Sequence, residues 1–317
     1  MQDWRPCASN EALRARASLF ADIRAFFTAR GVLEVDTPHL CAAGNPDPSL
    51  RGFTLASGGR DYFLATSPEF AMKRLLAAGV GDIYQLAHVF REAERGNHHN
   101  PEFMLLEWYR TGFELERLMD ETVELVRSVA DGRLQDYAVE VVEYRELFRR
   151  TLHLDPIHAS LGELRECAHA LPVAAPALGE ERDLWLDWLM GAHLQPRMAP
   201  HTLTLVTGYP ATQAAMAQLR EDGFSAHRFE LFCGPLELAN GYQELTGANE
   251  QRARFMADLA TRRRRGLMEP ALDERLLAAL SRLPACSGVA LGVDRLAMVV
   301  LGAQRLDDVV SFSAHNA

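Results

Sequence analysis

Two apolar segments on either side of a charged loop constrain the fold of this 317-residue chain more than any other feature. Residues 83–90 are apolar on both faces of an expected strand, and residues 103–109 have the composition of a second strand. Residues 91–102 between them are polar and carry charges of both signs. Two such strands predict a long hairpin, and hence an antiparallel sheet rather than regular alternation of strands and helices. Long ordered loops within compact domains are usually functional, so this loop is a candidate site.

Helices and further strands surround the hairpin. Asn10 and Ser67 each precede an amphipathic segment and are expected to cap a helix. The expected helices span residues 10–30, 67–78, 114–130 and 251–265, the expected strands span 32–38, 53–55, 203–206, 228–232 and 236–242, and residues 288–295 lead from a strand into a helix. This pattern predicts an α+β fold, an antiparallel sheet flanked by helices, in a single domain over residues 1–317 with a helical insertion at about 160–200.

Composition excludes several classes of protein. With 48% hydrophobic and 24% charged residues the chain has an ordinary globular composition, and no segment approaches the ~18 apolar residues that span a bilayer. Its net charge of −10 argues against general affinity for nucleic acid phosphates, although a local basic face stays open. The five cysteines lack a Cys-x-x-Cys motif, and the first residues do not resemble a signal peptide. These features predict a cytoplasmic protein without a membrane segment or a cysteine-rich zinc site.

Lysine is almost absent from the chain. Lys73 is the only lysine, so the 33 basic residues include 32 arginines (33 − 1). A Schiff-base or pyridoxal enzyme needs a lysine nucleophile, which here only Lys73 could supply. The chain also lacks the Gly-x-x-x-x-Gly-Lys-Ser/Thr phosphate loop. If the protein uses ATP, arginines must therefore hold the phosphates.

Three features at the ends of predicted strands could carry chemistry. Arg91 stands where a buried strand becomes a loop, from which its guanidinium could reach a phosphate or a carboxylate; the alternative is an ion pair with a neighbouring glutamate. Glu237 and Glu244 could share Mg²⁺ if both point the same way, but they could equally be two surface acids. Gly288 and Gly292, before Arg295, could let a nucleotide approach the backbone.

Other polar groups have simpler interpretations. His98 and His99 could bind a metal, but adjacent histidines point in different directions and no third ligand is evident. The arginine run at 262–265 is expected either at a solvated helix end or as a docking patch for an acidic or RNA-like partner. Cys286 is expected to serve packing rather than catalysis.

In order along the chain, these segments resemble the three motifs of class II aminoacyl-tRNA synthetases. The resemblance is carried by a helix and strand that end at Pro38, by Phe90-Arg91 with residues 99–103, and by residues 292–295. Its details are lysyl-type: Thr-Ser-Pro-Glu at 66–69, Leu-Leu-Glu-Trp-Tyr at 105–109 and Glu-Leu-Ala-Asn-Gly-Tyr-Gln-Glu-Leu at 237–245. Lysyl-tRNA synthetases carry an anticodon-binding domain before the first motif, whereas barely ten residues precede it here, so no such domain is expected.

A lysyl-type catalytic domain of this length, with Cys-Ser-Gly-Val-Ala-Leu-Gly-Val-Asp-Arg-Leu at 286–296, resembles the elongation factor P–(R)-β-lysine ligase family. The resemblance implies that the chain uses ATP and Mg²⁺ to activate (R)-β-lysine or lysine as an adenylate, and transfers it to a lysine side chain of elongation factor P. It implies a homodimer formed through the helix at 10–30, where Phe20, Ile23 and Phe27 offer more apolar surface than one sheet face needs. Stable tRNA binding is not expected.

The resemblance also implies a role for each candidate residue. Arg91 would bridge the substrate carboxylate and the α-phosphate, and Arg295 would lie by the adenine and the γ-phosphate. The catalytic residues would be Arg91, Glu237, Glu244 and Arg295, the Mg²⁺ ligands Glu237 and Glu244, the ATP site Arg91, Glu92, Ala93, Glu94, Asn100, Phe103, Glu237, Leu238, Gly292 and Arg295, and the diamino acid site Ser67, Pro68, Glu69, Tyr109, Asn240 and Glu244. The usual loop reads Phe-Arg-x-Glu, whereas residues 90–94 read Phe-Arg-Glu-Ala-Glu, so Glu94 or Glu92 takes the role of the acid, with Glu94 favoured.

Two other functions stay open. A ligase of this kind could join an activated amino acid to another small amine, and a non-catalytic paralogue could bind only a nucleotide or a partner. The presence of all four catalytic candidates, Arg91, Glu237, Glu244 and Arg295, argues against the non-catalytic paralogue. The sequence does not distinguish α-lysine from β-lysine, because both carry the same charges.

Overall fold

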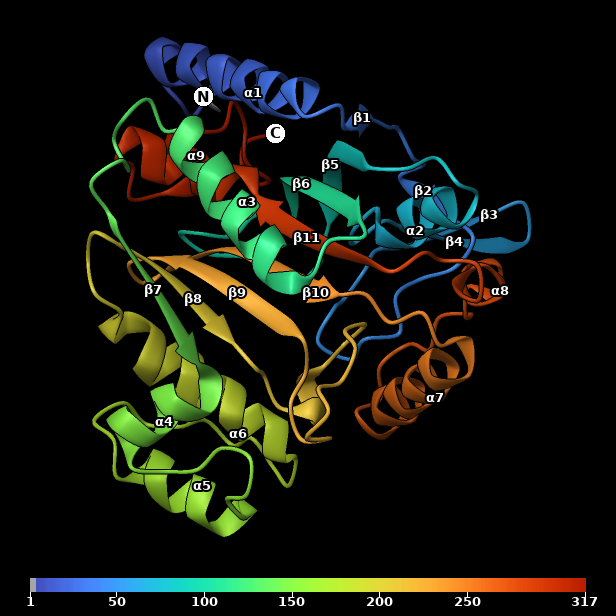
Figure 1. The fold of residues 1–317 in the computed structure, drawn as a ribbon, viewed down its shortest axis with the longest axis vertical. Helices are drawn as coiled ribbons and strands as arrows, with labels where there is room; N and C mark the ends of the chain where they lie inside the picture. Colours follow the sequence, from blue (N-terminus) through green and yellow to red (C-terminus); the bar gives the residue numbers. More distant parts are fainter. Residues whose placement is uncertain (1–3) are drawn as a thin grey trace. The chain divides into compact units, whose positions relative to one another are not determined.

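The computed structural model describes residues 4–317, which form two compact units (Figure 1). The first unit comprises residues 4–133 together with 244–317, and the second comprises residues 134–243. Each unit is built on strands covered by helices, as the α+β prediction requires. Within the described part of the chain, no helix combines the length and the apolar composition needed to cross a membrane.

The predicted hairpin is confirmed and forms the centre of the first unit. Strands β5 (Ile83–Phe90) and β6 (Glu102–Thr111) pair antiparallel, with Ile83 opposite Tyr109. Strand β11 (Cys286–Gly292) pairs antiparallel with the other edge of β6, and the short β1 (Leu33–Glu34) pairs parallel with β5. The strand order is therefore β1-β5-β6-β11. Residues 105–110 of β6 are all buried, as expected for an interior strand.

Helices cover this sheet and extend beyond it. Helix α1 packs on α3 and α9, and α3 and α9 in turn contact β11 and β6 (Figure 1). A second group of helices begins with α2, which contacts α8, and a small sheet of order β2-β4-β3 completes the unit. The bounds of these elements are α1 Asn10–Ala29, α2 Glu69–Ala77, α3 Leu115–Ser128, α7 Ala248–Arg264, α8 Glu274–Leu280, α9 Val293–Leu301, β2 Leu40–Cys41, β3 Thr54–Ser57 and β4 Arg60–Leu64.

Aromatic side chains join α1 to the central strands. The ring of Phe27 stacks on Tyr84, with centroids 4.4 Å apart, and meets Trp108 edge-on at 5.5 Å. Ile23 and Phe27 have no exposed surface within their own chain. These two side chains therefore leave no apolar surface for a second subunit, so the expectation that they would is wrong. The homodimer stays a prediction.

The second unit has its own sheet and its own helical core. Strands β10 (Leu236–Gln243), β9 (Arg228–Cys233) and β8 (Thr202–Thr207) pair antiparallel, and β7 (Ala138–Glu143) pairs parallel with β8. Its helices are α4 Tyr144–Leu152, α5 Leu161–His169 and α6 Arg182–Leu189, followed by a π-helical turn at Met190–Leu194 and 3₁₀ turns at Gln195–Arg197 and Ala211–Gln213. The helix-rich character predicted for residues 160–200 is confirmed, while the single-domain description stays a prediction.

Helix caps differ from the prediction by one residue. Ser9, not Asn10, caps α1, since its Oγ accepts a hydrogen bond from the backbone N of Ala12 at 3.1 Å. Pro68 occupies the cap position of α2, although Ser67 Oγ still accepts from the backbone N of Glu69 at 2.9 Å.

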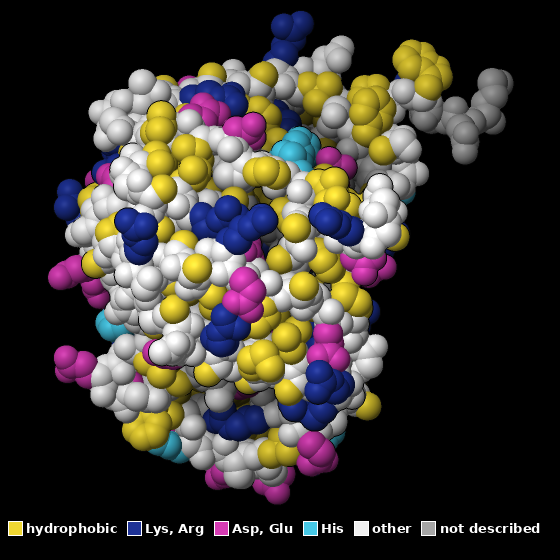
Figure 2. Space-filling view, turned by 90° about the vertical axis from the view of Figure 1, so that its right-hand side faces the viewer, with side chains coloured by type: hydrophobic (Ala, Val, Ile, Leu, Met, Phe, Trp, Pro, Cys, Tyr) yellow, Lys and Arg dark blue, Asp and Glu magenta, His cyan; other side chains and the backbone are white. Residues whose placement is uncertain are grey.

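On the face drawn in Figure 2, basic and acidic side chains are interspersed with hydrophobic ones.

We expect the ion pair between α1 and α9 to matter for stability. Arg16 Nη2 lies 2.5 Å from Asp294 Oδ1, and the Asp294 side chain is only 4% exposed. Arg16→Met leaves this carboxylate buried without its cation, so we expect a loss of about 3 kcal/mol in the free energy of unfolding. Arg24→Met, which breaks an exposed pair between the same helix and Glu34 of β1, should cost less than about 1 kcal/mol. Urea unfolding of both variants measures this, and equal losses would contradict it.

Candidate functional site

A buried group of acidic and hydrogen-bonding side chains lies in the first unit, and we call it the carboxylate cluster. Its members are Ser67, Glu69, Lys73, Glu107, Tyr109 and Glu244. The start of α2 supplies three of them within seven residues, and β6 supplies two on one face. Glu244 is fixed beside β11, because its backbone N donates to the carbonyl of Cys286 at 3.0 Å.

Lys73 is the only cation of the carboxylate cluster. Its Nζ lies 2.6 Å from Glu69 Oε1, one helical turn earlier, and 2.6 Å from Glu244 Oε2. Lys73 has no exposed surface and Glu244 is 1% exposed. Burial by itself lowers the pKa of Lys73, but the charges of Glu244 and Glu69 raise it above its ordinary value. The ammonium therefore stays protonated and compensates two buried carboxylates.

Glu107 lies on the other side of the cluster and is held by two hydroxyl groups. Ser67 Oγ donates to its Oε2 at 2.6 Å, and the Tyr109 hydroxyl donates to its Oε1 at 2.6 Å. Burial, with the charge of Glu69, raises the pKa of Glu107 to about 7, although these hydrogen bonds oppose the rise. Burial likewise raises the pKa of Glu244 to about 8, against the effect of Lys73.

The charge balance of the cluster suits a cationic ligand. Three carboxylates face a single ammonium group, so two further positive charges would balance the cluster when all its acids are ionised. A carboxylate that is buried in a protein needs a cation or hydrogen-bond donors to remain charged. The arrangement can therefore bind a small molecule that carries two amino groups.

Gly288 provides space for this arrangement. It lies opposite Tyr109 in the β6–β11 pairing. A Cβ at Gly288 would come within 2.3 Å of the Tyr109 ring and 2.4 Å of Glu244 Oε1, far inside contact distance. Only glycine lets the ring and the carboxylate approach this strand so closely.

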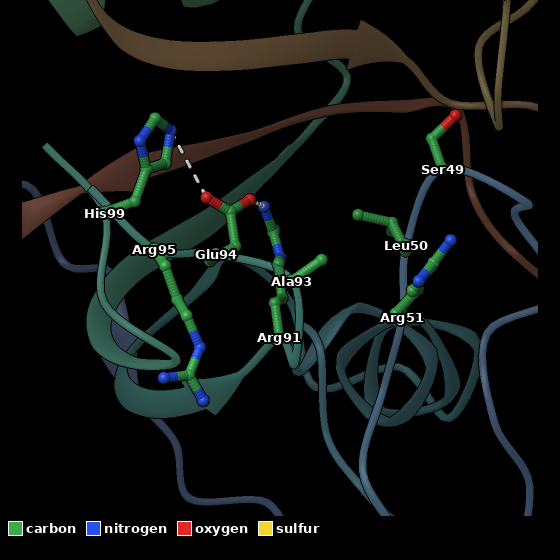
Figure 3. A pocket seen from close by; sticks show the side chains of 8 residues that line it. All are labelled: Ser49, Leu50, Arg51, Arg91, Ala93, Glu94, Arg95 and His99. Carbon is green, nitrogen blue, oxygen red and sulfur yellow. Dashed lines mark ion pairs between the residues drawn. The ribbon is translucent and has the colours of Figure 1, made fainter. Parts of the chain in front are cut away.

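A second site, which we call the loop pocket, lies in the charged loop of the hairpin and has a volume of about 280 Å³ (Figure 3). It is lined by Ser49, Leu50, Arg51, Arg91, Ala93, Glu94, Arg95 and His99. Three of these eight residues are arginines, whose planar guanidinium groups suit phosphate and carboxylate oxygens. The pocket can therefore bind an anion.

Arg91 connects the loop pocket with the carboxylate cluster. Its Nε donates to the carbonyl of Thr66 at 3.3 Å, next to Ser67 in the chain. Its guanidinium carbon lies 5.0 Å from the centre of the Phe103 ring, and its Nη1 lies 3.7 Å from Glu94 Oε1. These contacts hold the arginine at the loop pocket, with one hydrogen bond to the residue before Ser67.

Glu94 faces the loop pocket, whereas Glu92 is exposed and does not line it (Figure 3). Glu94 Oε2 lies 3.2 Å from His99 Nε2, and Arg295 Nη2 lies 2.7 Å from the same nitrogen. Arg295 thus reaches the loop from the first turn of α9, which follows Gly292. Of the two acids that the sequence left as alternatives, only Glu94 is oriented toward the candidate nucleotide site.

The remaining residue predicted in this loop, Asn100, is bound to backbone groups. Its Nδ2 donates to the carbonyl of Glu102 at 2.6 Å, and its Oδ1 accepts from the backbone N of Ala314 at 3.0 Å. Asn100 therefore connects the loop with the C-terminal segment.

Three predicted residues lie on β10 of the second unit. The pairing with β9 shifts between Glu237 and Ala239, so Leu238 is the extra residue of a β-bulge. Glu237 lies opposite Phe232, and Asn240 lies opposite Glu230. Phe232 and Glu230 are two residues apart, so their side chains share one face of the sheet. The bulge therefore brings Glu237 and Asn240 to the same face. Because Glu237 and Glu244 belong to different units, their shared Mg²⁺ site stays a prediction.

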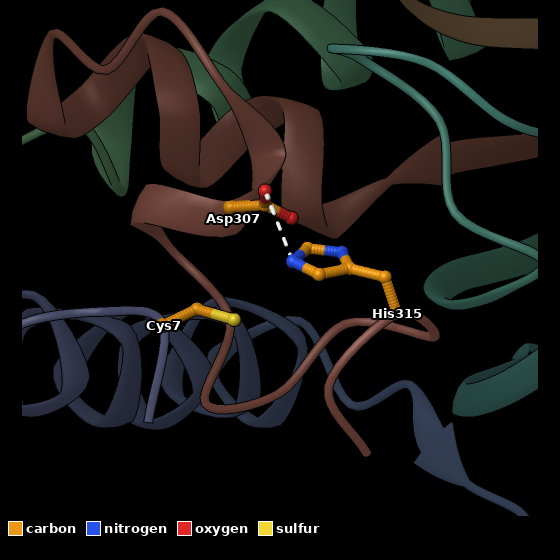
Figure 4. Close-up of side chains that lie close together, drawn as sticks. All are labelled: Cys7, Asp307 and His315. Carbon is orange, nitrogen blue, oxygen red and sulfur yellow. Dashed lines mark ion pairs between the residues drawn. The ribbon is translucent and has the colours of Figure 1, made fainter. Parts of the chain in front are cut away.

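Among residues 4–317, one group of side chains has the donor types and spacing of a metal site (Figure 4). The ligand atoms of Cys7, Asp307 and His315 lie within 4.8 Å of one another. Cys7 Sγ already donates to Asn316 Oδ1 at 3.2 Å, and the His315 side chain is 65% exposed. None of the predicted site residues belongs to this group.

Sequence reasoning missed several residues of both sites. Lys73 and Glu107 were not predicted, nor were the pocket arginines Arg51 and Arg95. The i,i+4 spacing of Glu69 and Lys73 on a predicted helix was an available signal for their ion pair. No local pattern singles out Arg51, because its role depends on a loop folding back onto residue 92.

The comparisons with known proteins agree on one family. The sequence model for the tRNA synthetases class II (D, K and N) matches residues 1–316. The elongation factor P–(R)-β-lysine ligase of Pectobacterium atrosepticum is 45% identical over 323 residues, which cover 99% of this chain and 98% of that protein. The ligase of the same name from Pasteurella multocida is 44% identical over 324 residues, covering 100% and 99%.

We expect affinity for lysine to rise with pH. A bound ammonium group favours the charged forms of Glu107 and Glu244, whose pKa values are raised to about 7 and about 8. Both pKa values lie above the ordinary value of 4.5, so the ligand-free protein loses stability as the pH rises from about 5 to 8 and the two acids ionise. A bound ammonium group offsets this loss. The dissociation constant for lysine should fall at least about tenfold between pH 6 and pH 8, with release of protons.

Isothermal titration calorimetry at several pH values, in buffers of different ionisation enthalpy, measures the affinity and the proton release together. A pH-independent affinity without proton release would show that these acids do not receive the ligand.

Gly288→Ala should destabilise the protein. The new Cβ overlaps the Tyr109 ring and Glu244, so we expect a loss of about 1–3 kcal/mol in the free energy of unfolding. Gly292→Ala is the matched control on the same strand, since a Cβ there meets only Arg295 at 3.7 Å, an ordinary contact. Thermal unfolding of both variants tests this, and equal stability would contradict the close approach at Gly288.

Proposed function

Since the chain belongs to the family of class II tRNA synthetases (D, K and N), we propose that it activates (R)-β-lysine or lysine with ATP and transfers the acyl group to a lysine side chain of elongation factor P. The observation that carries this proposal is the carboxylate cluster joined to the loop pocket through Arg91. The names of the relatives, which align over nearly their whole length, supply the acceptor.

The charges of the two sites match those of a diamino acid bound beside a nucleotide. The carboxylate cluster lacks two positive charges, which the two ammonium groups of the substrate provide. The substrate carboxylate would then lie toward Arg91, whose guanidinium is anchored at Thr66. A monoamino acid would leave one carboxylate of the cluster without a cation, which is costly in a buried site. This difference selects a diamino acid.

The reaction follows from these positions. A carboxylate oxygen of the substrate attacks the α-phosphorus of ATP, and pyrophosphate leaves. Arg91 lies between the two sites, where its fixed positive charge would stabilise the negative charge that develops on the α-phosphate. The acceptor amine then attacks the carbonyl carbon of the adenylate, the new amide bond forms, and AMP leaves with the electrons of the broken acyl–oxygen bond.

Magnesium fits the acidic residues by its chemistry, because Mg²⁺ prefers carboxylate and phosphate oxygens. Glu237 and Glu244 are the proposed ligands. Lys73 Nζ lies 2.6 Å from Oε2 of Glu244. When bound, the ion would neutralise phosphate charge.

Other features of the function are also proposals. A ligase for a translation factor would work in the cytoplasm, with residues 1–317 as a synthetase-like catalytic domain. The predicted homodimer and the lack of stable tRNA binding belong to the same proposal. Sedimentation at micromolar concentrations tests the oligomeric state directly.

The proposed function is tested by incubating the protein with ATP, labelled (R)-β-lysine or lysine, and either elongation factor P or total tRNA. We expect label in elongation factor P and none when its acceptor lysine is replaced by arginine. Labelling of tRNA at a comparable rate, or of the lysine-free factor, would overturn the proposal. Absence of ATP–pyrophosphate exchange with every amino acid would instead support the non-catalytic alternative.

Arg91→Ala should reduce adenylate formation by about 10²–10³-fold while the fold is retained, because the guanidinium acts on charge that develops during the reaction. ATP–pyrophosphate exchange measures the loss, and circular dichroism checks the fold. Near-normal exchange in the folded variant would remove Arg91 from its role.

Glu94→Gln should impair ATP use more than Glu92→Gln, since only Glu94 lines the loop pocket. The KM for ATP in the exchange reaction provides the comparison. The reverse ranking would transfer the role of the acid to Glu92.

A further inference from the structure

The surface of this protein offers no lysine amine. The chain has one lysine among 317 residues, and Lys73 has no exposed surface. Every dark blue side chain in Figure 2 is therefore an arginine. Composition alone explains why arginine is common, but it does not explain where the single lysine lies.

This distribution bears on the proposed reaction. An acyl-adenylate is a mixed anhydride, and a neutral amine attacks its carbonyl carbon, forming an amide while AMP leaves and the amine nitrogen loses a proton. The proposed acceptor is a lysine side chain, so a lysine near the enzyme's own site would have the same reactivity. An arginine guanidinium stays protonated and delocalised, so it does not compete as a nucleophile.

Lys73 is the one side-chain amine that could be acylated, because it lies among the carboxylates that would receive the substrate. Its Nζ is 2.6 Å from Glu69 Oε1 and 2.6 Å from Glu244 Oε2, and the side chain has no exposed surface. A nucleophile must reach the carbonyl carbon, and the Lys73 amine has no exposed surface and is held by two carboxylates. The same contacts that compensate the two acids therefore keep the amine from reaching the adenylate.

We infer that the enzyme is protected from acylation by its own adenylate, because its single side-chain amine is buried between two carboxylates and the other 32 of its 33 lysine and arginine side chains are arginines. The inference rests on the proposed function and goes beyond it: it states what the enzyme's own residues do toward the activated intermediate. It also implies that one arginine-to-lysine change at the loop pocket makes the enzyme its own acceptor.

The loop pocket offers two positions for that change. Arg51 and Arg95 line the pocket and are exposed at its rim. Arg95→Lys or Arg51→Lys places a flexible primary amine there at little change in charge. Arg95→Gln removes the guanidinium without adding an amine, and Arg150→Lys adds an amine on α4 at a residue that does not line the pocket.

The first experiment uses the unaltered protein. It is incubated with ATP and lysine without an acceptor, and its intact mass and peptides are analysed, so that side-chain acylation is distinguished from acylation of the α-amine. In parallel, an N-hydroxysuccinimide ester is added to native and urea-unfolded protein. We expect no acyl group on Lys73 in either native sample and full labelling of Lys73 after unfolding. Acylation of Lys73 in the native protein would overturn the inference.

The second experiment compares the four variants under the same conditions. Arg95→Lys or Arg51→Lys should gain one lysyl group at the new lysine, at least about tenfold faster than Arg150→Lys, because the amine is held near the adenylate. Arg95→Gln should gain none. No gain in either pocket variant that retains ATP–pyrophosphate exchange, or equal gain at residue 150, would overturn the inference. Absence of exchange in the unaltered protein would instead overturn the proposed function, while the ester labelling of Lys73 still tests its protection.

Discussion

The ammonium of Lys73, held between Glu69 and Glu244, is the interaction on which the rest of the candidate site depends. It joins the start of α2 to the segment beside β11, two parts of the chain far apart in sequence, at 2.6 Å on each side. Because all three groups are largely removed from water, none could keep its charge without the others. Removing the cation would leave buried carboxylates without a compensating charge, which is strongly destabilising.

The same ion pairs define what the site lacks. Lys73 balances part of the negative charge, and Ser67 and Tyr109 satisfy Glu107 by hydrogen bonds without neutralising it. Two amino groups would supply the positive charge that the cluster still lacks. Arg91 lines the loop pocket and donates to the carbonyl of Thr66, next to the cluster, so the candidate sites for a cation and for an anion lie in one unit. Such adjacency is what an enzyme that joins an amino acid carboxylate to a phosphate requires.

Much of the fold was predictable because local patterns encode it. The two apolar runs of the hairpin, the helices that follow Ser9 and Pro68, and the strand that enters α9 all lie where periodicity and turn residues indicate. The short strands β2 and β4, the parallel edge strand β7, and helices α4 and α8 were missed. Short or edge elements gain most of their stability from neighbours rather than from their own sequence. The cap of α1 is Ser9 rather than Asn10, and the local sequence does not distinguish them because serine and asparagine are about equally suitable caps.

The ordered motifs, the near absence of lysine and the candidate residues within the motifs are all recognisable from the amino-acid sequence, because each depends only on which residues follow one another along the chain. Which of these residues meet is set by the folded chain. Lys73 pairs with Glu244 from a distant segment as well as with nearby Glu69, Glu94 rather than Glu92 faces the loop pocket, and a bulge at Leu238 brings Glu237 and Asn240 to one face. A charge pair in a core depends on the distance and burial of its partners. Both are set by how strands and helices pack, and neither is written in any local segment.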